Sequence, residues 1–303
     1  MTHRSLIMEL RGRLGNQLFQ FALGYATAKR VDAPLFLSTE HIPPADLLLP
    51  QIVGPPAYQN ARRSDLVRLG AQQYSGSDSA VLAALQGLTR HAARAAHHAI
   101  HRAPPILVEL DEETTRVEER FLAPKLPCVL RGYFQSEGYF AEYATDINSA
   151  ITLPNAADFL PADLPRPLIA VSFRRGDYNS LGWALPIDYY RTALTQLLER
   201  TSPGTLVLTG DDLAFLELVV PLVSPFAQQV VNATEFAVDA ISQLAILASC
   251  DHSIVANSSF SWWGAWLAEH RSSGSPHLVF SPSGWIGGDE CAPARWVSVE
   301  WDA

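Results

Sequence analysis

Two adjacent arginines, Arg174 and Arg175, follow directly after a run of mostly apolar residues, 168–173, in the middle of the chain. That run has the pattern of a buried parallel β-strand that ends in a polar loop. In open α/β sheets, ligands bind just outside the carboxyl ends of the strands. Two guanidinium groups at such a place favour an anion with several oxygen atoms, a phosphate or a carboxylate. The alternative is that both arginines pair with acidic side chains at the surface.

Two more of the predicted strands end in polar residues that suit a nucleotide. Asp211 and Asp212 follow an apolar strand, where their carboxylates can bind ribose hydroxyls or guanine N–H groups, or can instead cap the next helix. Asn257, Ser258 and Ser259 stand where a strand becomes a helix, so hydroxyls and unpaired backbone N–H groups point outward together. A nucleotide diphosphate would satisfy the arginines, the aspartates and this serine-rich helix start.

The N-terminal part of the chain has a glycine-rich turn, GRLG at 12–15, between a short predicted strand and a helix. Asn16 is the predicted N-cap of that helix, and such a helix start is another place where anions bind. The spacing is not that of the GxGxxG dinucleotide fingerprint. A loop further along carries Tyr133, Gln135 and Glu137. Aromatic faces, an amide and a carboxylate are groups that contact sugars, although an ordinary capped loop has a similar composition.

The elements that must position these residues alternate along the chain. A proline-rich segment, 154–167, separates two halves, and we predict an N-terminal acceptor-side domain at 1–160 and a C-terminal nucleotide-binding domain at 161–303. In the second half, strands are predicted at 168–173, 205–209, 229–231, 253–256 and 278–281, and helices at 187–200, 212–220, 239–249 and 259–269. This alternation predicts a parallel, doubly wound sheet. Two Rossmann-like halves that face a cleft are the architecture of a GT-B-like glycosyltransferase, which we therefore predict. In that chemistry, arginines and helix N–H groups neutralise the leaving diphosphate, so no metal is needed.

The composition excludes several other classes of protein. The chain has 303 residues, 48% of them apolar, and a net charge of −9, which disfavours binding to nucleic acid. The three cysteines are far apart and indicate neither a zinc site nor a disulfide framework. We expect no signal peptide and no membrane-spanning helix, and therefore a cytoplasmic enzyme, with peripheral contact at the inner membrane face as an alternative. A His-rich segment at 84–103 reads as a solvated basic helix.

The sequence resembles the α-1,2-fucosyltransferases of glycosyltransferase family 11, within the wider group that includes α-1,6- and protein O-fucosyltransferases. Five segments in the same order carry the resemblance and span most of the chain. They are GRLGNQLFQFALGYATA at 12–28, GYFQSEGYF at 132–140, FRRGDY at 173–178, TGDD at 209–212 and LASCDHSIVANSSFSWWGAWLA at 247–268. The last block is the most characteristic, and RRGD alone would be a weak signal.

The resemblance implies a GT-B fold, GDP-fucose as donor, inversion at the anomeric carbon of fucose, and the 2-hydroxyl of a terminal β-galactoside as acceptor. GDP-fucose is a substrate, so no cofactor or metal is expected. By position, Arg174 would hold the β-phosphate during catalysis, with Arg175 supporting it. The other expected donor-binding residues are Ser172, Asp211, Asp212, Asn257, Ser258, Ser259, Phe260, Gly12, Arg13, Asn16 and Gln17. The expected acceptor-binding residues are Tyr133, Gln135 and Tyr178.

The chain departs from the family pattern at Ser172, where the family usually has a histidine. This motivates an alternative, a GDP-sugar-binding protein without catalysis; another is a fucosyltransferase with a different linkage or acceptor. An inverting transfer also benefits from a general base within reach of the acceptor hydroxyl. Asp177 and Glu137 are the candidates, although Asp177 can equally pair with a neighbouring arginine.

Overall fold

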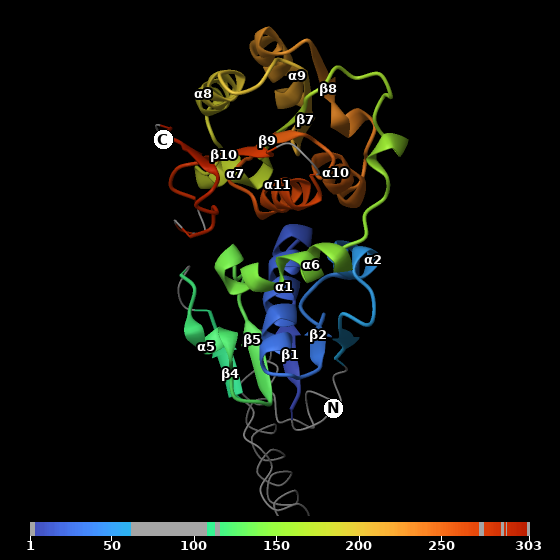
Figure 1. The fold of residues 1–303 in the computed structure, drawn as a ribbon, viewed down its shortest axis with the longest axis vertical. Helices are drawn as coiled ribbons and strands as arrows, with labels where there is room; N and C mark the ends of the chain where they lie inside the picture. Colours follow the sequence, from blue (N-terminus) through green and yellow to red (C-terminus); the bar gives the residue numbers. More distant parts are fainter. Residues whose placement is uncertain are drawn as a thin grey trace, which may run out of the picture.

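The computed structural model describes residues 4–61, 108–112, 116–272, 276–285, 288 and 290–301 of the chain. The predicted basic helix at 84–103 lies outside these residues. Two parallel β-sheets, one from each half of the sequence, lie one above the other in the molecule (Figure 1). The prediction of two α/β halves is therefore confirmed.

The N-terminal half contains a sheet of five parallel strands in the order β3-β2-β1-β5-β4. Its strands are β1 (Leu6–Glu9), β2 (Leu35–Ser38), β3 (Gln59–Asn60), β4 (Val108–Asp111) and β5 (Cys128–Arg131). Its helices are α1 (Leu14–Arg30), α2 (Leu49–Ile52), α5 (Glu119–Leu122) and α6 (Ala144–Ala150), with short 3-10 turns η1 (Pro44–Asp46) and η2 (Glu137–Tyr139).

The C-terminal half contains a sheet of six parallel strands in the order β11-β10-β9-β6-β7-β8. Its strands are β6 (Leu168–Phe173), β7 (Thr205–Gly210), β8 (Gln229–Asn232), β9 (His252–Ile254), β10 (Leu278–Pro282) and β11 (Val297–Val299). Its helices are α7 (Gly176–Leu181), α8 (Ile187–Leu198), α9 (Leu213–Val223), α10 (Ala240–Leu247) and α11 (Ser259–Arg271).

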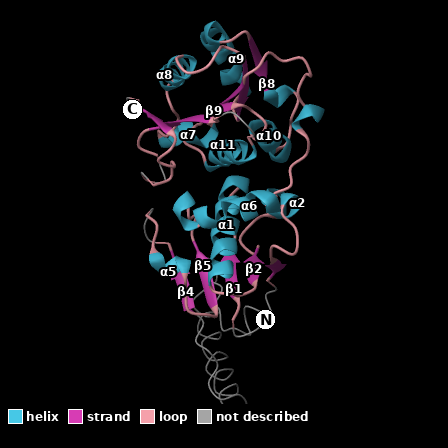
Figure 2. Cartoon of the chain, viewed as in Figure 1, coloured by secondary structure: helices cyan, strands magenta, loops and turns pink. Residues whose placement is uncertain are grey.

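Helices cover both faces of the C-terminal sheet (Figure 2), as the alternating side chains of β6 show. Ile169, Val171 and Phe173 share one buried cluster with apolar residues of α8 and α9. Leu168 and Ala170 belong to a second cluster, which includes apolar residues of α10. Successive side chains of a strand point to opposite faces, so β6 needs apolar residues throughout, as its sequence has. The predicted doubly wound sheet is confirmed.

The two halves pack together through α1 and α11, which meet between the sheets (Figure 1). Trp262, Trp263 and Trp266 on α11 are completely buried, as predicted. The centre of the Phe19 ring on α1 lies 4.5 Å from that of Trp262, and Phe140 stacks on Trp263 at 5.6 Å. These aromatic rings belong to one cluster that also contains residues of both sheets' helices, so the packing of each half depends on the other.

Two local predictions were wrong, and some short strands were not predicted. Helix α1 begins at Leu14 with Arg13 at its N-cap, so Asn16 lies inside the first turn instead of capping it. The residues after β6 form a short helix, α7, where a loop was expected. Asp211, 36 residues later, accepts hydrogen bonds from Arg175 N (2.8 Å) and Gly176 N (3.2 Å), which satisfies the start of α7 from another strand. The short edge strands β3 and β11 were not predicted at all.

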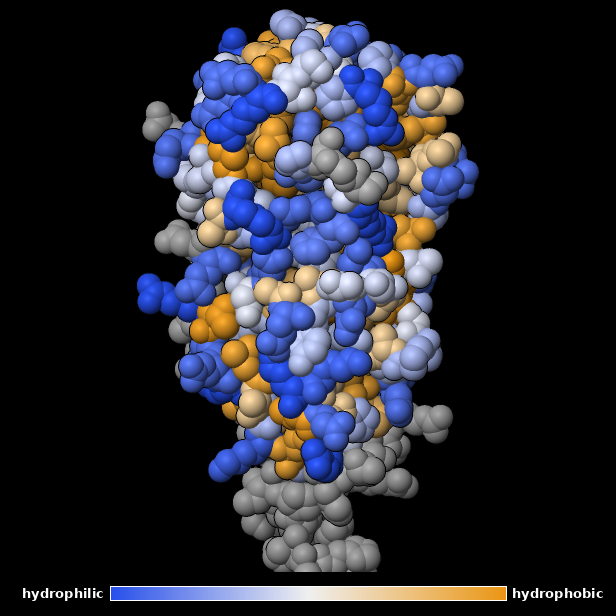
Figure 3. Space-filling model, viewed as in Figure 1, coloured by the Kyte–Doolittle hydropathy of each residue, from blue (hydrophilic) through white to orange (hydrophobic). Residues whose placement is uncertain are grey.

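The last strand of the first sheet ends at Arg131 and the first strand of the second sheet begins at Leu168. The domain boundary at 160/161 falls between them and stays a prediction. None of the described helices is long and apolar enough to cross a membrane. On the face drawn in Figure 3, hydrophilic side chains predominate at the level where the two halves meet.

Candidate active site

A pocket of about 790 Å³ lies between the two halves, at the carboxyl ends of strands from both sheets. Its C-terminal wall comes from the segments after β6, β7 and β9, and its N-terminal wall from those after β1, β4 and β5. Most of the predicted site residues line it: Gly12, Arg13, Asn16, Tyr133, Gln135, Ser172, Arg174, Asp177, Tyr178, Asp211, Asn257, Ser258, Ser259 and Phe260. Five segments that are distant in the sequence therefore meet at one cavity.

Arg174 is held in place by two carboxylates. Its Nη1 lies 2.6 Å from Asp211 Oδ2, and its Nη2 donates to Asp177 Oδ1 at 2.5 Å. The guanidinium carbon also lies 5.1 Å from the centre of the Tyr178 ring. The side chain of Arg174 is only 19% exposed, so these contacts fix a cation at the pocket wall. A guanidinium has five N–H donors, and those not used by the carboxylates can reach an anion.

Asp211 organises this wall through both of its carboxylate oxygens. Oδ2 pairs with Arg174, while Oδ1 accepts the N–H groups that begin α7. A side chain at Gly176 would meet Oδ2 at 2.7 Å, so the glycine permits this close approach. Asp212 lies outside the pocket and caps α9, because its Oδ1 accepts from Phe215 N at 3.0 Å. The donor-binding prediction for Asp212 is therefore wrong, and the capping alternative is correct.

Arg175 does not line the pocket either. Its guanidinium carbon lies 4.1 Å from the centre of the Phe215 ring on α9. Its Nε is buried, and among the described residues none accepts a hydrogen bond from it. The prediction that Arg175 binds the donor is therefore not supported. The chain turns into α7 at Arg175, so of the two arginines Arg174 alone lines the pocket.

The N-terminus of α11 opens onto the pocket beside Arg174. Ser258 is its N-cap and accepts from Phe260 N at 3.3 Å, and Ser261 donates to Ala256 O at 3.0 Å. The N-terminus of α1 approaches from the other half: a Cβ at Gly15 would lie 2.6 Å from Phe260 N. Both helices are long enough to place a positive partial charge at this end, so their N-termini together favour an anion.

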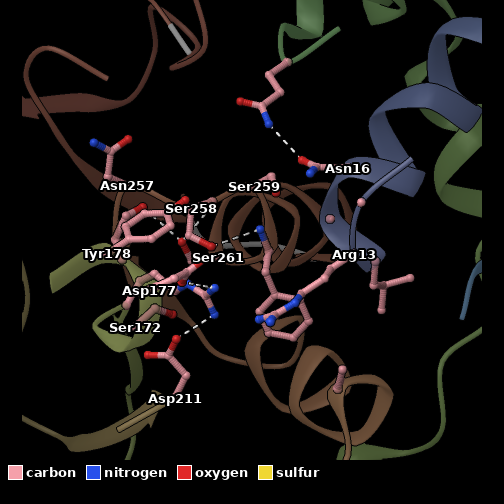
Figure 4. A pocket seen from close by; sticks show the side chains of 18 of the residues that line it. Arg13, Asn16, Ser172, Asp177, Tyr178, Asp211, Asn257, Ser258, Ser259 and Ser261 are labelled. Carbon is pink, nitrogen blue, oxygen red and sulfur yellow. Dashed lines mark hydrogen bonds and ion pairs between the residues drawn. The ribbon is translucent and has the colours of Figure 1, made fainter. Parts of the chain in front are cut away.

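Arg13 and Asn16 face the serines across the pocket (Figure 4). Among the described residues, none forms an ion pair with Arg13, which makes it a second cation directed at the same space. Asn16 Oδ1 accepts from Gln135 Nε2 at 2.8 Å, which joins α1 to the loop after β5.

Burial raises the pKa of the Tyr178 phenol, partly opposed by the charges of Arg174 and Arg13. The phenol therefore stays neutral and can donate a hydrogen bond.

Gln17 was predicted to bind the donor, but it is fully buried behind the pocket wall. Its Nε2 donates to Gly12 O (2.9 Å) and to Asp46 O (2.7 Å). Its Oε1 accepts from Leu49 N at 3.1 Å, so the side chain ties the glycine-rich turn to η1 and α2. Gln17 positions the N-terminal wall and does not contact the cavity.

Glu137 was a candidate base, and the structure places it outside the pocket. Its Oε1 accepts from Trp266 Nε1 at 2.7 Å, and both of its oxygens bind the guanidinium of Arg295. Burial alone would raise the pKa of Glu137, but Arg295 and Trp266 outweigh it and lower the pKa. A carboxylate held in this way joins the two halves and is not available to an acceptor. The other candidate base, Asp177, forms an ion pair with Arg174, which was the alternative prediction for this residue.

Ser172 lines the pocket but is 6% exposed, with its hydroxyl accepting from Thr209 Oγ1 at 3.2 Å. Several other lining residues were not predicted from the sequence, chiefly Trp183, Gln243, Asp46 and Glu112. Trp183 is 40% exposed and meets the Tyr178 ring edge-on at 5.6 Å.

Glu112 follows β4 directly, so the rule that found Asp211 after β7 would have found it too. Among the described residues, no group of three or more His, Cys, Asp or Glu side chains could hold a metal ion.

Known proteins resemble this chain in sequence. Residues 115–273 match the profile of the family described as glycosyl transferase family 11. The chain is 31% identical over 130 residues to the O-antigen biosynthesis glycosyltransferase WbnK of Escherichia coli, a match that covers 40% of this chain and 39% of that protein. It is 24% identical to an alpha-1,2-colitosyltransferase of Escherichia coli, over 97% of this chain and 99% of that protein.

Solved structures resemble the fold at low sequence identity. POFUT1 in complex with GDP matches with a TM-score of 0.53 at 13% identity, over 92% of this chain and 98% of that one. FUT1 of Arabidopsis thaliana in complex with GDP matches with a TM-score of 0.51 at 11% identity, over 92% of this chain and 70% of that one. The predicted GT-B fold class is thus confirmed. The chain is a glycosyltransferase that belongs to glycosyl transferase family 11.

Proposed function

We propose that this enzyme transfers L-fucose from GDP-fucose to the 2-hydroxyl of a terminal β-galactoside, with inversion and without a metal ion. The observation that carries the proposal is Arg174, fixed by Asp177 and Asp211 beside the N-terminus of α11. The diphosphate of the donor would lie against this guanidinium and the N–H group of Ser259 at the start of α11.

Charge develops on the leaving diphosphate as the bond from fucose to the β-phosphate breaks. Donors that are already in place stabilise such charge better than water does, because they need no reorganisation. Arg174, Arg13 and the two helix N-termini are all directed at the same part of the pocket. This set of groups supports a metal-free mechanism, which we propose on that ground.

The acceptor would enter against the N-terminal wall. Tyr133 is 47% exposed and Gln135 is fixed by Asn16, so both offer polar groups to a sugar. Tyr178 completes the proposed acceptor site from the opposite wall. An aromatic face and a few placed hydrogen-bonding groups are typical of a pocket for a small polar ligand. We also propose a cytoplasmic location, which the three separate, buried, unpaired cysteines support.

A second candidate donor is GDP-colitose, because the relative that aligns with nearly the whole chain is an alpha-1,2-colitosyltransferase. Colitose is L-fucose without its 3-hydroxyl, so both donors would place the same diphosphate on Arg174. The α-1,2 linkage in that relative's name supports the proposed linkage but leaves the sugar open.

The test is incubation of the purified protein with GDP-fucose or GDP-colitose and a panel of β-galactosides, followed by NMR of the product. The proposal predicts transfer of fucose to galactose O2. Transfer of colitose alone would select the second donor, and another linkage would select a related activity. Binding of GDP-fucose without transfer to any acceptor would show the non-catalytic alternative and overturn the proposal.

A further inference from the structure

Glu112 is a carboxylate of the pocket that the proposed donor site does not use. It follows β4 on the N-terminal wall and lines the cavity. Its Oε2 accepts from Tyr133 N at 2.6 Å, and its Oε1 accepts from Phe134 N at 3.0 Å. Its own N–H donates to Arg131 O at 2.8 Å. The side chain is therefore fixed between the ends of β4 and β5, with an oriented carboxylate.

The carboxylate of Glu112 can accept more hydrogen bonds than these. An ionised carboxylate has about four lone-pair sites, and the backbone N–H groups of Tyr133 and Phe134 supply two donors. Phe134 N also lies 3.1 Å from Oε2, so most of the contact falls on that oxygen. Oε1 keeps a lone pair for a hydroxyl from the pocket, which a proton acceptor requires.

Burial raises the pKa of Glu112, although the N–H groups of Tyr133 and Phe134 oppose it, and the negative charge of Glu118 raises it further. In its ionised form, a carboxylate with a raised pKa is a stronger proton acceptor than an exposed one. Both the raised pKa of Glu112 and its position in the pocket lining therefore suit a proton acceptor.

The geometry of an inverting transfer limits where the base can stand. The acceptor oxygen attacks the anomeric carbon on the face opposite the leaving group, and the base lies on that same side. The proposed leaving group lies on the C-terminal wall, where Asp177 and Asp211 are both bound to Arg174. The base must then come from the N-terminal wall.

Two carboxylates of the described residues line that wall, Asp46 and Glu112. Asp46 is exposed on the short turn η1. Glu112 is half-buried and holds the backbone of Tyr133, next to the proposed acceptor site at Tyr133 and Gln135. Of the two, only Glu112 combines a fixed orientation with a place beside the acceptor.

We propose that Glu112 is the general base of the transfer, an assignment that rests on the proposed function. The carboxylate takes the proton of the acceptor 2-hydroxyl while that oxygen bonds to the anomeric carbon. The bond from the anomeric carbon to the β-phosphate oxygen breaks at the same time, and its electron pair leaves with GDP. Glu112 then releases the proton to water, so the enzyme returns to its starting state.

The decisive variant is Glu112→Gln, which keeps the size of the side chain and an oxygen for one backbone N–H. Transfer is expected to fall 10²- to 10⁴-fold, because general-base catalysis contributes about that much. The affinity for GDP-fucose, measured by calorimetry, is expected to stay within about threefold, because Glu112 contacts none of the groups proposed to hold the diphosphate. Formate added to Glu112→Ala is expected to restore part of the rate, which a purely structural role would not allow.

The pH profile supplies a readout on the unaltered enzyme. Among the described residues, the titratable groups that interact electrostatically with Glu112 are Glu118, Tyr139 and Cys291. Burial raises the pKa of Cys291 to about 12 and raises that of Tyr139 also, so neither changes charge near neutral pH. The rate is expected to fall on acidification with a midpoint above the ordinary range of a glutamate, and Glu112→Gln removes that limb.

Glu119→Gln, an exposed glutamate on α5, is the matched control and is expected to keep the wild-type rate. Full transfer by Glu112→Gln, or a loss only in Asp46→Asn, would overturn the assignment while leaving the proposed function intact. Loss of GDP-fucose affinity in Glu112→Gln, with no rescue by formate, would show a structural role instead. An inactive wild-type enzyme would overturn the proposed function first, and the assignment with it.

Discussion

In the proposed donor site, Arg174 is expected to contribute the largest share of the binding free energy of the diphosphate. Replacing it by alanine removes charge-assisted hydrogen bonds to the diphosphate and leaves Asp177 and Asp211 without their cation. GDP affinity is expected to fall by about 1.5–3 kcal/mol, which calorimetry can measure. Arg191→Ala, at an arginine that is 57% exposed on α8, is the control and should bind GDP normally. Equal affinities for Arg174→Ala and wild type would refute the assignment of the phosphate site.

The strand-and-loop pattern did not separate Arg174 from Arg175, because both follow the same strand, and only the family resemblance favoured Arg174 for the phosphate. The difference arises from α7, whose start is satisfied by Asp211 from the next strand. The position of Glu137 also depends on a distant segment and could not be predicted from the local sequence. It stands in a loop with sugar-binding composition, but its partner Arg295 is 158 residues away, and that pairing removes it from the site. Strand ends can be predicted locally, whereas partners supplied by distant segments cannot.

At the scale of helices and strands, the site depends on the close packing of the N-terminus of α1 against the N-terminus of α11. Gly15 permits it, because a Cβ there would lie 2.6 Å from Phe260 N and from Ser259 C. Gly15→Ala is expected to force the helices apart, with a loss of about 1–3 kcal/mol in stability and weaker GDP binding. Thermal unfolding and calorimetry would measure the two effects.

Gly24→Ala in the same helix provides the matched control. The added Cβ would meet the end of the Leu35 side chain at 3.0 Å, a group that can move, far from Ser259. GDP affinity is expected to stay at the wild-type value. If Gly15→Ala bound GDP as tightly as Gly24→Ala, the contact between the helix starts would have no part in donor binding.

Glu137 joins η2 to α11 and to the C-terminal segment, and its charge makes stability depend on pH. Arg295 and Trp266 lower its pKa in the folded state below the ordinary value of 4.5, although burial opposes this. The stabilisation is therefore present above about pH 4.5 and is lost as the pH falls through the lower folded value. Glu137→Gln is expected to cost about 1–2 kcal/mol at pH 7, since Arg295 is 42% exposed.

Unfolding by denaturant at several pH values would test this. The difference between wild type and Glu137→Gln is expected to shrink below pH 4.5. Glu142→Gln, which removes the exposed partner of Arg30, should cost less and serves as the control. A difference that stays constant down to pH 3 would contradict the role of the charge.

At the scale of the whole molecule, a protein with a net charge of −9 places two arginines, Arg13 and Arg174, at a cavity between its halves that also has four carboxylates in its lining. The parallel order of strands could be predicted from the sequence because apolar runs alternate with amphipathic helices. The sequence also indicated that Trp262, Trp263 and Trp266 are buried. It did not indicate that they pack against Phe19 and Phe140 of the other half, because the helix–helix contact depends on both halves folding together.

The proposed reaction is the inverting, metal-free transfer of fucose to galactose O2. Proton NMR of GDP-fucose and lactose, followed in real time with the enzyme in EDTA, tests it most directly. The expected result is an α-linked fucose on galactose O2 that appears in step with free GDP. A β-linked product, a different linkage, release of GDP with free fucose only, or activity that returns only when a metal is added would contradict the account.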